Sequence, residues 1–255
     1  MAAMQIAMTN AIQAGTVHYS AVDGSEIEAY LAVPQDDAPH GGIVLVHHLP
    51  GYDEATREFA RTFAVHGYNA IVPNLYSREG GPDVSPEDAA AAVRADGGVA
   101  DERLIADVDD AAGYLRALPT ANGKVGVIGY CSGGRQSVLA AITVDVDAAV
   151  DCYGAYVTGT VPDGWPLKIT ALNERVAEAR CPILGLFGQD DKYPTPEQVA
   201  DFEQLLKNAG KEYEFHSYEG AGHAFFAADR PSFRPEAAKD GWARIAAFYG
   251  KHLGA

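Results

Sequence analysis

The sequence contains few cysteines and no long hydrophobic run. It has three cysteines in 255 residues, widely spaced and without a CxxC pair, so it indicates neither a disulfide framework nor a thiolate zinc site. The first 15 residues lack a cationic segment with a continuous apolar core, and no window approaches 18 uninterrupted apolar residues. These absences argue against a secretion signal and a membrane span. We therefore expect a cytoplasmic protein.

Positive charge is also scarce. Lys and Arg number 19 against 35 Asp and Glu, which gives a formal net charge of −16. A field of that sign disfavours nucleic acids and anionic membrane surfaces as partners. The hydrophobic content of 47% is ordinary for a globular protein. With no repeat or low-complexity linker, we expect a single domain over residues 1–255, with residues 1–14 as a loosely ordered N-terminal extension.

Buried apolar runs alternate with amphipathic segments along the chain. We predict strands at 16–20, 26–33, 42–47, 69–73, 124–129, 147–152, 183–187 and 212–218. We predict helices at 54–66, 86–94, 101–118, 133–142, 196–209 and 234–252. This order predicts an α/β fold with a mostly parallel central sheet flanked by helices, whose ligands bind at the carboxyl ends of the strands.

The segment Gly129-Tyr130-Cys131-Ser132-Gly133 fits the pattern G-x-nucleophile-x-G between a predicted strand and a predicted helix. The sharp turn requires small residues two positions before and after the nucleophile, and the helix N-terminus favours a thiolate. Ser132 is a weaker candidate because centring the pattern on it places Tyr130 where a small residue is needed. Alternatively, Cys131 is an ordinary buried thiol beside a tight turn.

An acid and a histidine follow in the chain order that this fold requires. Asp190 follows the predicted strand 183–187, and His223 lies in a glycine-flanked loop after the strand 212–218. We predict a triad in which His223 withdraws the proton of Cys131 and Asp190 orients the imidazole. Asp191 competes with Asp190 for the same role.

The backbone amides of Ser132 and Leu49 are the predicted donors to the oxyanion of the tetrahedral intermediate. Leu49 lies in the loop after the third predicted strand, where Pro50 has no N–H to donate. Five aromatic residues are predicted either to line the substrate pocket or to pack in the core: Tyr52, Tyr76, Tyr130, Tyr153 and Phe225.

The segments GYCSGG, GQDDKYP and YEGAGHAFF resemble the three catalytic segments of the dienelactone hydrolase family. The resemblance runs from about residue 42 to the C-terminus. It implies an α/β-hydrolase fold and hydrolysis of a small lactone or ester through an acyl-enzyme, without a cofactor. It also places Cys131, Asp190 and His223 in the family's triad positions.

The sequence departs from the family pattern in its substrate-binding positions. His48 stands where the family has a glutamate that activates the thiol, and we expect His48 to act as its replacement. An arginine four residues after the histidine is replaced by Ala227, with Arg230 three positions later. Arg94 is the basic residue nearest to the family's other carboxylate-binding arginine. These departures argue against dienelactone itself as the substrate.

Two alternatives remain open: a degenerate hydrolase fold that binds a ligand without turnover, and a thiol redox sensor centred on Cys131. A metal site built from His47, His48, Asp53 and His223 is disfavoured because adjacent histidines on a strand point to opposite faces. We expect a monomer or homodimer that acts on a small-molecule lactone or ester, with no metal, nucleic acid or membrane partner.

Overall fold

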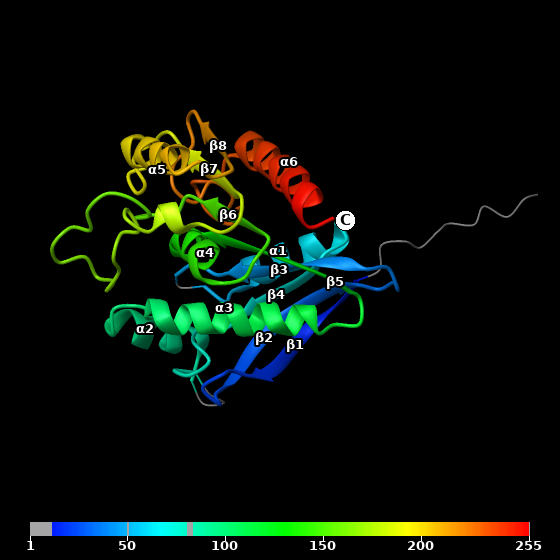
Figure 1. The fold of residues 1–255 in the computed structure, drawn as a ribbon. Helices are drawn as coiled ribbons and strands as arrows, with labels where there is room; N and C mark the ends of the chain where they lie inside the picture. Colours follow the sequence, from blue (N-terminus) through cyan, green and yellow to red (C-terminus); the bar gives the residue numbers. More distant parts are fainter. Residues whose placement is uncertain (1–11, 50, 81–83, 255) are drawn as a thin grey trace, which may run out of the picture.

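The computed structural model describes residues 12–49, 51–80 and 84–254, and all eight of its described strands form one sheet (Figure 1). The strands are β1 (Ile12–Ser20), β2 (Glu26–Pro34), β3 (His40–Val46), β4 (Asn69–Pro73), β5 (Ala121–Tyr130), β6 (Ala148–Cys152), β7 (Ile183–Gly188) and β8 (Tyr213–Tyr218). The helices are α1 (Glu54–Val65), α2 (Pro86–Ala95), α3 (Asp101–Arg116), α4 (Ser132–Thr143), α5 (Pro196–Asn208) and α6 (Pro235–His252). A 3₁₀ turn covers Val176–Glu178.

The strand order is β1-β2-β4-β3-β5-β6-β7-β8. Strand β2 is antiparallel to both of its neighbours, and the pairs from β4 to β8 are parallel. The parallel strands need crossover connections, which the helices between them supply. The predicted fold class, a mostly parallel sheet flanked by helices, is confirmed.

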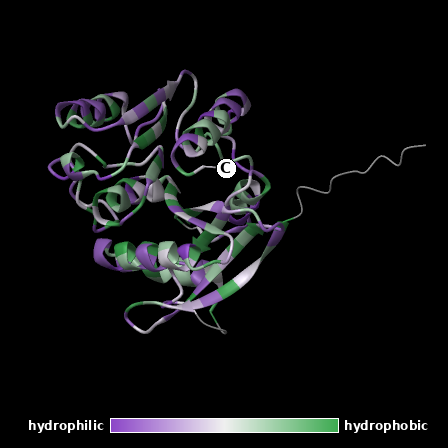
Figure 2. Cartoon of the chain, turned by 45° about the vertical axis from the view of Figure 1, so that its right-hand side comes forward, coloured by the Kyte–Doolittle hydropathy of each residue, from purple (hydrophilic) through white to green (hydrophobic). Residues whose placement is uncertain are grey.

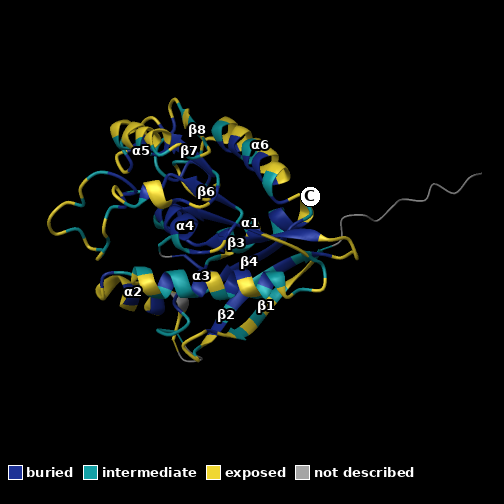
Figure 3. Ribbon diagram, viewed as in Figure 1, coloured by how far each residue is buried: buried dark blue, intermediate teal, exposed yellow. Residues whose placement is uncertain are grey.

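Strands β3, β4, β6 and β7 are buried along their whole length because helices cover both faces of the sheet. In β3, Val44 and Val46 pack on the side of α3 and α4, whereas Ile43 and Leu45 pack on the side of α1 and α6. Figure 3 shows the central strands as buried between helices whose outer faces are exposed. Figure 2 shows the matching hydropathy: the central strands are mainly hydrophobic, and the helices carry both hydrophobic and hydrophilic residues.

The N-terminal strand starts earlier than predicted. Residues 12–14 belong to β1, where Ile12 pairs with Pro34, whereas the sequence predicted an extension through residue 14. Pairing with β2 explains the difference, because polar and small residues are accepted on an edge strand. Residues 1–11 of the predicted extension lie outside the described residues.

The carboxyl ends of β3 to β8 meet at one edge of the sheet, and the loops that follow them carry every predicted catalytic residue. The long connection between β6 and β7 forms, apart from the 3₁₀ turn, neither helix nor strand. Among the described residues, no helix is both long and apolar enough to cross a bilayer.

Candidate active site

Cys131 lies on a tight turn between β5 and α4, with φ of 58° and ψ of −122°. A Cβ atom on Gly129 would collide with the carbonyl of Gly133, and one on Gly133 would collide with the carbonyl of Val46. Both positions therefore require glycine, for the packing reason expected from the sequence. Cys131 is the N-cap residue of the 12-residue helix α4, so the helix dipole favours a negative charge on its sulfur.

His223 is held by a buried carboxylate. Its Nδ1–H donates to Oδ2 of Asp191 at 2.9 Å, and the Asp191 side chain is only 2% exposed. The second oxygen, Oδ1, accepts from the backbone N–H of Tyr193 at 2.9 Å. Both carboxylate oxygens are thus occupied, which fixes the orientation of the imidazole.

The histidine is electrostatically linked to Cys131 as well. Burial lowers the pKa of His223, but hydrogen bonding and charge at Asp191 and at Cys131 outweigh that effect and raise it to about 10. The ring of Tyr153 packs edge-on against the imidazole, with ring centroids 5.1 Å apart. A protonated His223 beside Cys131 is therefore favoured at neutral pH.

Asp190 does not contact His223, and the sequence-based assignment of the orienting acid is corrected to its neighbour. Asp190 is exposed and lies at the rim of an open cavity, whereas Asp191 is buried. The cause is the turn after β7: the backbone N–H of Asp190 donates to the carbonyl of Ala221 at 2.9 Å. This bond joins the β7 turn to the histidine loop and leaves the next side chain to point inward.

Three cavities meet at Cys131. The first, the Trp165 cavity, has about 110 Å³ and is also lined by Leu49, Tyr156 and Trp165. The second, the Arg230 cavity, has about 180 Å³ and is also lined by His48, His223 and Arg230. The third is open to solvent and is also lined by Asp190 and His223. An elongated substrate with its carbonyl at Cys131 would thus extend in two directions.

The predicted oxyanion donors lie beside the nucleophile. Leu49 and Ser132 both line the Trp165 cavity next to Cys131. Ser132 is the first residue of α4, so its N–H has no partner within the helix. Pro50, which the sequence excluded as a donor, lies outside the described residues.

His47 and His48 have different roles. His47 is buried, its Nε2 accepts from the N–H of Leu75 at 3.2 Å, and its Nδ1 is 3.0 Å from the carbonyl of His48. Burial lowers the pKa of His47 to about 4, so it is neutral and ties two loops together. The divergent directions of the two rings agree with the argument against a shared metal site.

The partners of His48 are Arg230 and Asp53. Nη2 of Arg230 donates to Nε2 of His48 at 2.9 Å. Nε2 of His48 also lies 3.3 Å from Oδ2 of Asp53. Burial lowers the pKa of His48 and the charge of Arg230 lowers it further, while Asp53 opposes them. His48 lines the Arg230 cavity with Cys131, so it shares the site and positions an arginine there.

Two other predicted residues lie away from the site. Phe225 is fully buried and packs against Tyr153, Tyr218 and Phe226, and Arg94 is exposed on α2. Neither lines a cavity that contains Cys131. The backbone turns at Ala224, whose φ is 62°, so His223 lines cavities at Cys131 while Phe225, two positions later, packs into the core.

Three other predicted pocket residues line cavities at Cys131. Tyr76 is in the Trp165 cavity, and Tyr130 and Tyr153 are in the Arg230 cavity. All three are at least 95% buried. Tyr52 lines none of the three cavities at Cys131.

Sequence reasoning selected one residue of the β6–β7 connection that lines the site and missed two others. Tyr153, predicted as a pocket wall, lines the Arg230 cavity, whereas Tyr156 and Trp165, which were not selected, line the Trp165 cavity. Tyr153 and Tyr156 have φ of 47° and 58°, an uncommon backbone conformation for a tyrosine. Aromatic residues in a loop rich in glycine and proline were the available signal, because strain and aromatic side chains concentrate at functional sites.

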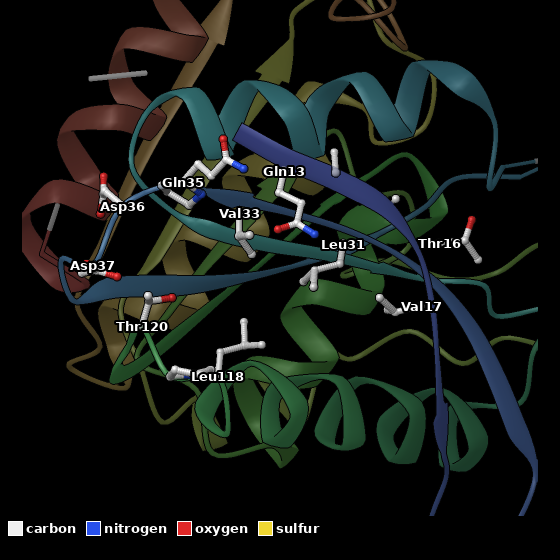
Figure 4. Close-up of a pocket in the computed structure, with 14 residues that line it drawn as sticks. Gln13, Thr16, Val17, Leu31, Val33, Gln35, Asp36, Asp37, Leu118 and Thr120 are labelled. Carbon is white, nitrogen blue, oxygen red and sulfur yellow. The ribbon is translucent and has the colours of Figure 1, made fainter. Parts of the chain in front are cut away.

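A hollow larger than any of these three cavities lies elsewhere (Figure 4). It has about 570 Å³ and is formed by β1, β2 and the turn before β5, with Gln13, Leu31 and Thr120 among its lining residues. No histidine or cysteine lines it, and it is shallow. Size alone therefore does not identify the candidate site, whereas the convergence of a thiol, an imidazole and a buried carboxylate does.

A family model described as "Dienelactone hydrolase family" matches residues 27–253. The chain belongs to the dienelactone hydrolase family. The match spans β2 to the end of α6 and includes all three segments that contain Cys131, Asp191 and His223. Members of this family are carboxylic ester hydrolases.

Individual relatives agree with this membership. The chain is 33% identical over 233 residues to an Escherichia coli protein named "Putative carboxymethylenebutenolidase", covering 91% of this chain and 84% of that one. It is 29% identical to a Bradyrhizobium "Probable 2-oxo-3-(5-oxofuran-2-ylidene)propanoate lactonase", covering 91% and 92%. A solved structure of a "Putative Dienelactone Hydrolase" from Klebsiella pneumoniae superposes with a TM-score of 0.79 at 30% identity, covering 95% and 100%.

Proposed function

We propose that this hydrolase cleaves a small ester or opens a small lactone through a covalent thioester on Cys131, with His223 as general acid and base and Asp191 as the orienting acid. The observation that carries the proposal is that the buried Asp191 carboxylate holds His223 in the cavities that His223 and Cys131 line together. It connects a nucleophile at a helix N-terminus to a fixed imidazole.

In the first half of the reaction, the Cys131 thiolate attacks the carbonyl carbon. A carbon–sulfur bond forms, and the carbonyl π electrons move to the oxygen. The amides of Ser132 and Leu49 would donate to this oxyanion, and removing one such donor typically costs about 3 kcal/mol of transition-state stabilisation. The carbon–oxygen bond then breaks while protonated His223 gives its proton to the departing alkoxide, which in a lactone stays attached to the acyl chain.

In the second half, neutral His223 removes a proton from a water molecule that attacks the thioester carbonyl. The carbon–sulfur bond breaks, and the sulfur leaves as a thiolate beside the re-protonated imidazole. The hydrogen bond to Asp191 supports both halves because it holds Nδ1 as the donor and leaves Nε2 free to exchange the proton. Release of the carboxylic acid product restores the starting enzyme.

The Arg230 cavity is expected to bind an anionic substituent of the substrate. Arg230 is the cation on this wall, and its contact with His48 directs it toward the cavity that contains Cys131. Glu58 and Asp229 line the same cavity, so an anion would be favourable only in direct contact with the guanidinium. Resemblance to the family, which binds a substrate carboxylate, agrees with this role for Arg230.

The test is mass spectrometry of the protein after brief incubation with activated esters and lactones. We expect an acyl adduct that maps to the peptide containing Cys131 and decays at the rate of product release. Cys131→Ala should give no adduct and lose at least 10³-fold of kcat/KM. Cys181→Ala is the matched control, since Cys181 is buried away from the site.

Full turnover by Cys131→Ala would overturn the proposed nucleophile. Binding of substrates without any adduct or turnover would favour the non-catalytic binding protein. Reversible oxidation as the sole chemistry of Cys131 would favour the redox sensor, although burial keeps the pKa of the neighbouring Cys152 thiol far above its usual value.

A further inference from the structure

The three cavities at Cys131 differ in the reacting groups that line them. His223 lines the Arg230 cavity and the third, solvent-open cavity, and it is not among the described residues that line the Trp165 cavity. The residues proposed as oxyanion donors have the opposite distribution, since Leu49 and Ser132 line the Trp165 cavity and neither of the other two. Cys131 therefore lies between cavities that contain the imidazole and a cavity that contains the proposed donors.

This arrangement gives an ester a direction at Cys131. The departing alkoxide takes its proton from the imidazole, so the leaving oxygen must come within about 2.6–3.2 Å of a ring nitrogen of His223, or reach it through one water. The alcohol part of the substrate therefore extends into a cavity that His223 lines. The acyl part, attached on the other side of the carbonyl carbon, extends into the Trp165 cavity.

The second half of the reaction favours the same direction. The acyl group stays on Cys131 after the alcohol has left, and His223 activates the water that attacks it. The solvent-open cavity offers a route for this water, because both residues line it. An acyl group in the Trp165 cavity leaves the route free, whereas an acyl group in the solvent-open cavity would block it.

The walls of the Trp165 cavity suit an apolar acyl group. They are mainly aliphatic and aromatic, and include Val99, Leu167 and Ile169. Among the described residues that line it, Arg135 is the one with a permanently charged side chain. Its Nη1 and Nη2 already donate to the two carboxylate oxygens of Asp101, at 2.9 and 2.8 Å. A carboxylate on the acyl group would thus be a buried charge without a counter-ion, which is unfavourable.

The volume of the cavity limits the length of the acyl chain. An apolar cavity of about 150 Å³ holds benzene, a molecule of six carbons. The Trp165 cavity has about 110 Å³, so by the same ratio it suits about four carbons beyond the carbonyl carbon. In its wall the ring of Trp165 packs edge-on against Tyr156, with centroids 4.9 Å apart. A pentanoyl group fits this space best.

We propose that the Trp165 cavity is the acyl subsite of this hydrolase and takes an apolar chain of about four carbons, while the alcohol part of the substrate extends beside His223. The inference rests on the proposed function, because an acyl subsite has meaning only if Cys131 attacks an ester or lactone carbonyl. It adds a direction to that function: the anionic group expected at Arg230 belongs to the alcohol part of the substrate.

The kinetic test uses p-nitrophenyl esters of unbranched acids from acetic to octanoic acid, so that only the acyl chain varies. We expect kcat/KM to rise about fourfold per CH₂ up to the pentanoate, which is the gain for burying one CH₂. It should then fall about fivefold or more by the octanoate, because a longer chain overfills the cavity. A kcat/KM that rises through the whole series, or that does not respond to chain length, would overturn the subsite.

Two substitutions in the wall should move the optimum in opposite directions. Val99 and Leu167 line the Trp165 cavity and neither of the other two, and both are only partly buried. Leu167→Ala enlarges the cavity and should move the best substrate to the hexanoate or a longer ester. Val99→Phe fills it and should move the best substrate to the butanoate or a shorter ester. An optimum that neither variant moves would overturn the subsite.

Ala55→Leu is the matched control, because Ala55 is a partly buried residue of α1 that lines the Arg230 cavity. It should keep the pentanoate optimum and lower kcat/KM for isobutyl pentanoate relative to ethyl pentanoate about threefold. Val99→Phe should leave this alcohol ratio unchanged. The reverse result, with Ala55→Leu changing the acyl optimum and Val99→Phe the alcohol ratio, would overturn the proposed direction.

A structural test does not depend on ester turnover. With butyl methanethiosulfonate, the Cys131 sulfur attacks the sulfur that carries the butyl chain, an S–S bond forms and methanesulfinate leaves. The transferred sulfur then stands for the carbonyl carbon of a pentanoyl thioester. We expect a crystal structure of this derivative to show the butyl chain in the Trp165 cavity. A chain in either of the other two cavities would overturn the subsite. A chain in the Trp165 cavity of an enzyme that turns over no ester would reject the proposed function and support the subsite.

Discussion

The two enclosed cavities beside Cys131 differ in the chemistry of their walls. The Arg230 cavity has ionisable groups, namely His48, His223, Arg230, Glu58 and Asp229, and its arginine is exposed. The Trp165 cavity contains a single arginine, which is buried and already neutralised by Asp101. The comparison teaches that the two sides of Cys131 offer different surroundings: ionisable side chains in one cavity, and mainly apolar side chains with a neutralised arginine in the other.

The difference originates in the elements that build each cavity. The Arg230 cavity is formed by the turn before α1 and the loop between β8 and α6, where charged residues reach solvent. The Trp165 cavity lies under the β6–β7 connection, which covers α4 with aromatic and aliphatic side chains. Solvent screens charges in the first cavity, whereas the cover of the second makes each unpaired atom expensive.

The largest effect is expected from Asp191, because substrates bound in either cavity depend on the imidazole that it holds. Asp191→Asn should lower kcat/KM by about 10²–10⁴ for every substrate, because asparagine does not hold the imidazole in the productive tautomer. Asp190→Asn is the matched control and should stay within about twofold. Equal losses for the two variants would contradict the assignment of Asp191.

The pH dependence of kcat/KM in the same two variants tests the assignment of Asp191 further. His223 has a pKa raised to about 10 by Asp191 and Cys131 despite its burial. The protonated imidazole is therefore present below this pH and is lost as the pH rises through it, so kcat/KM of the wild type should fall near pH 10. Asp191→Asn should move this alkaline limb to lower pH, and Asp190→Asn should leave it in place, as measured in pH–rate profiles.

A second large effect is expected from Asp151, which lies on β6 beneath the turn that both cavities share. Burial raises the pKa of the Asp151 carboxyl from 3.8 to about 7, although the N–H of Gly154 donates to its Oδ1 at 2.7 Å. The folded protein therefore binds this proton more tightly than the unfolded chain. Stability from the protonated carboxyl is fully present below pH 3.8 and is lost as the pH rises through 7.

Asp151→Asn keeps the acceptor for Gly154 and removes the titration. Relative to the wild type, the free energy of unfolding should rise by on the order of 2–4 kcal/mol at pH 8 and change little at pH 4. Urea denaturation at the two pH values measures the difference. An identical pH dependence in both proteins would show that the carboxyl titrates normally.

A smaller effect is expected from the charge in the Arg230 cavity. Arg230→Gln should lower the kcat/KM ratio of pentanoyloxyacetate to isobutyl pentanoate about fivefold at low salt, because an exposed cation contributes only a modest attraction. In the wild type the same ratio should decline as the salt concentration rises. A ratio that does not respond to the substitution would remove Arg230 from substrate recognition.

The smallest effect is expected from His48, whose Nε2 is 2.9 Å from Nη2 of Arg230. His48→Leu removes the acceptor for Arg230 and should reduce the same ratio about twofold, whereas His48→Gln offers an amide oxygen and should retain it. Steady-state kinetics of the two variants tests this difference. A large loss of kcat with every substrate would instead indicate that His48 acts on Cys131, as the sequence comparison with the family suggested.

Much of the fold and part of the site followed from local patterns. The order of strands and helices, the turn around Cys131 and the loop position of His223 were all predicted from periodicity, glycine spacing and chain order. Asp190 and Asp191 could not be separated, because adjacent residues in a turn differ only in which one points inward. Trp165 and Tyr156 were missed because their connection has no regular periodicity.

The sequence by itself determined the alternation of elements, the glycines at 129 and 133 and the set of reactive side chains, since these depend on residues close together along the chain. Only the tertiary structure decided that Asp191 rather than Asp190 meets His223, that Arg230 is held by His48, and that a mainly apolar cavity lies beside Cys131. Such features depend on side-chain direction and burial, which arise only when distant segments pack against one another.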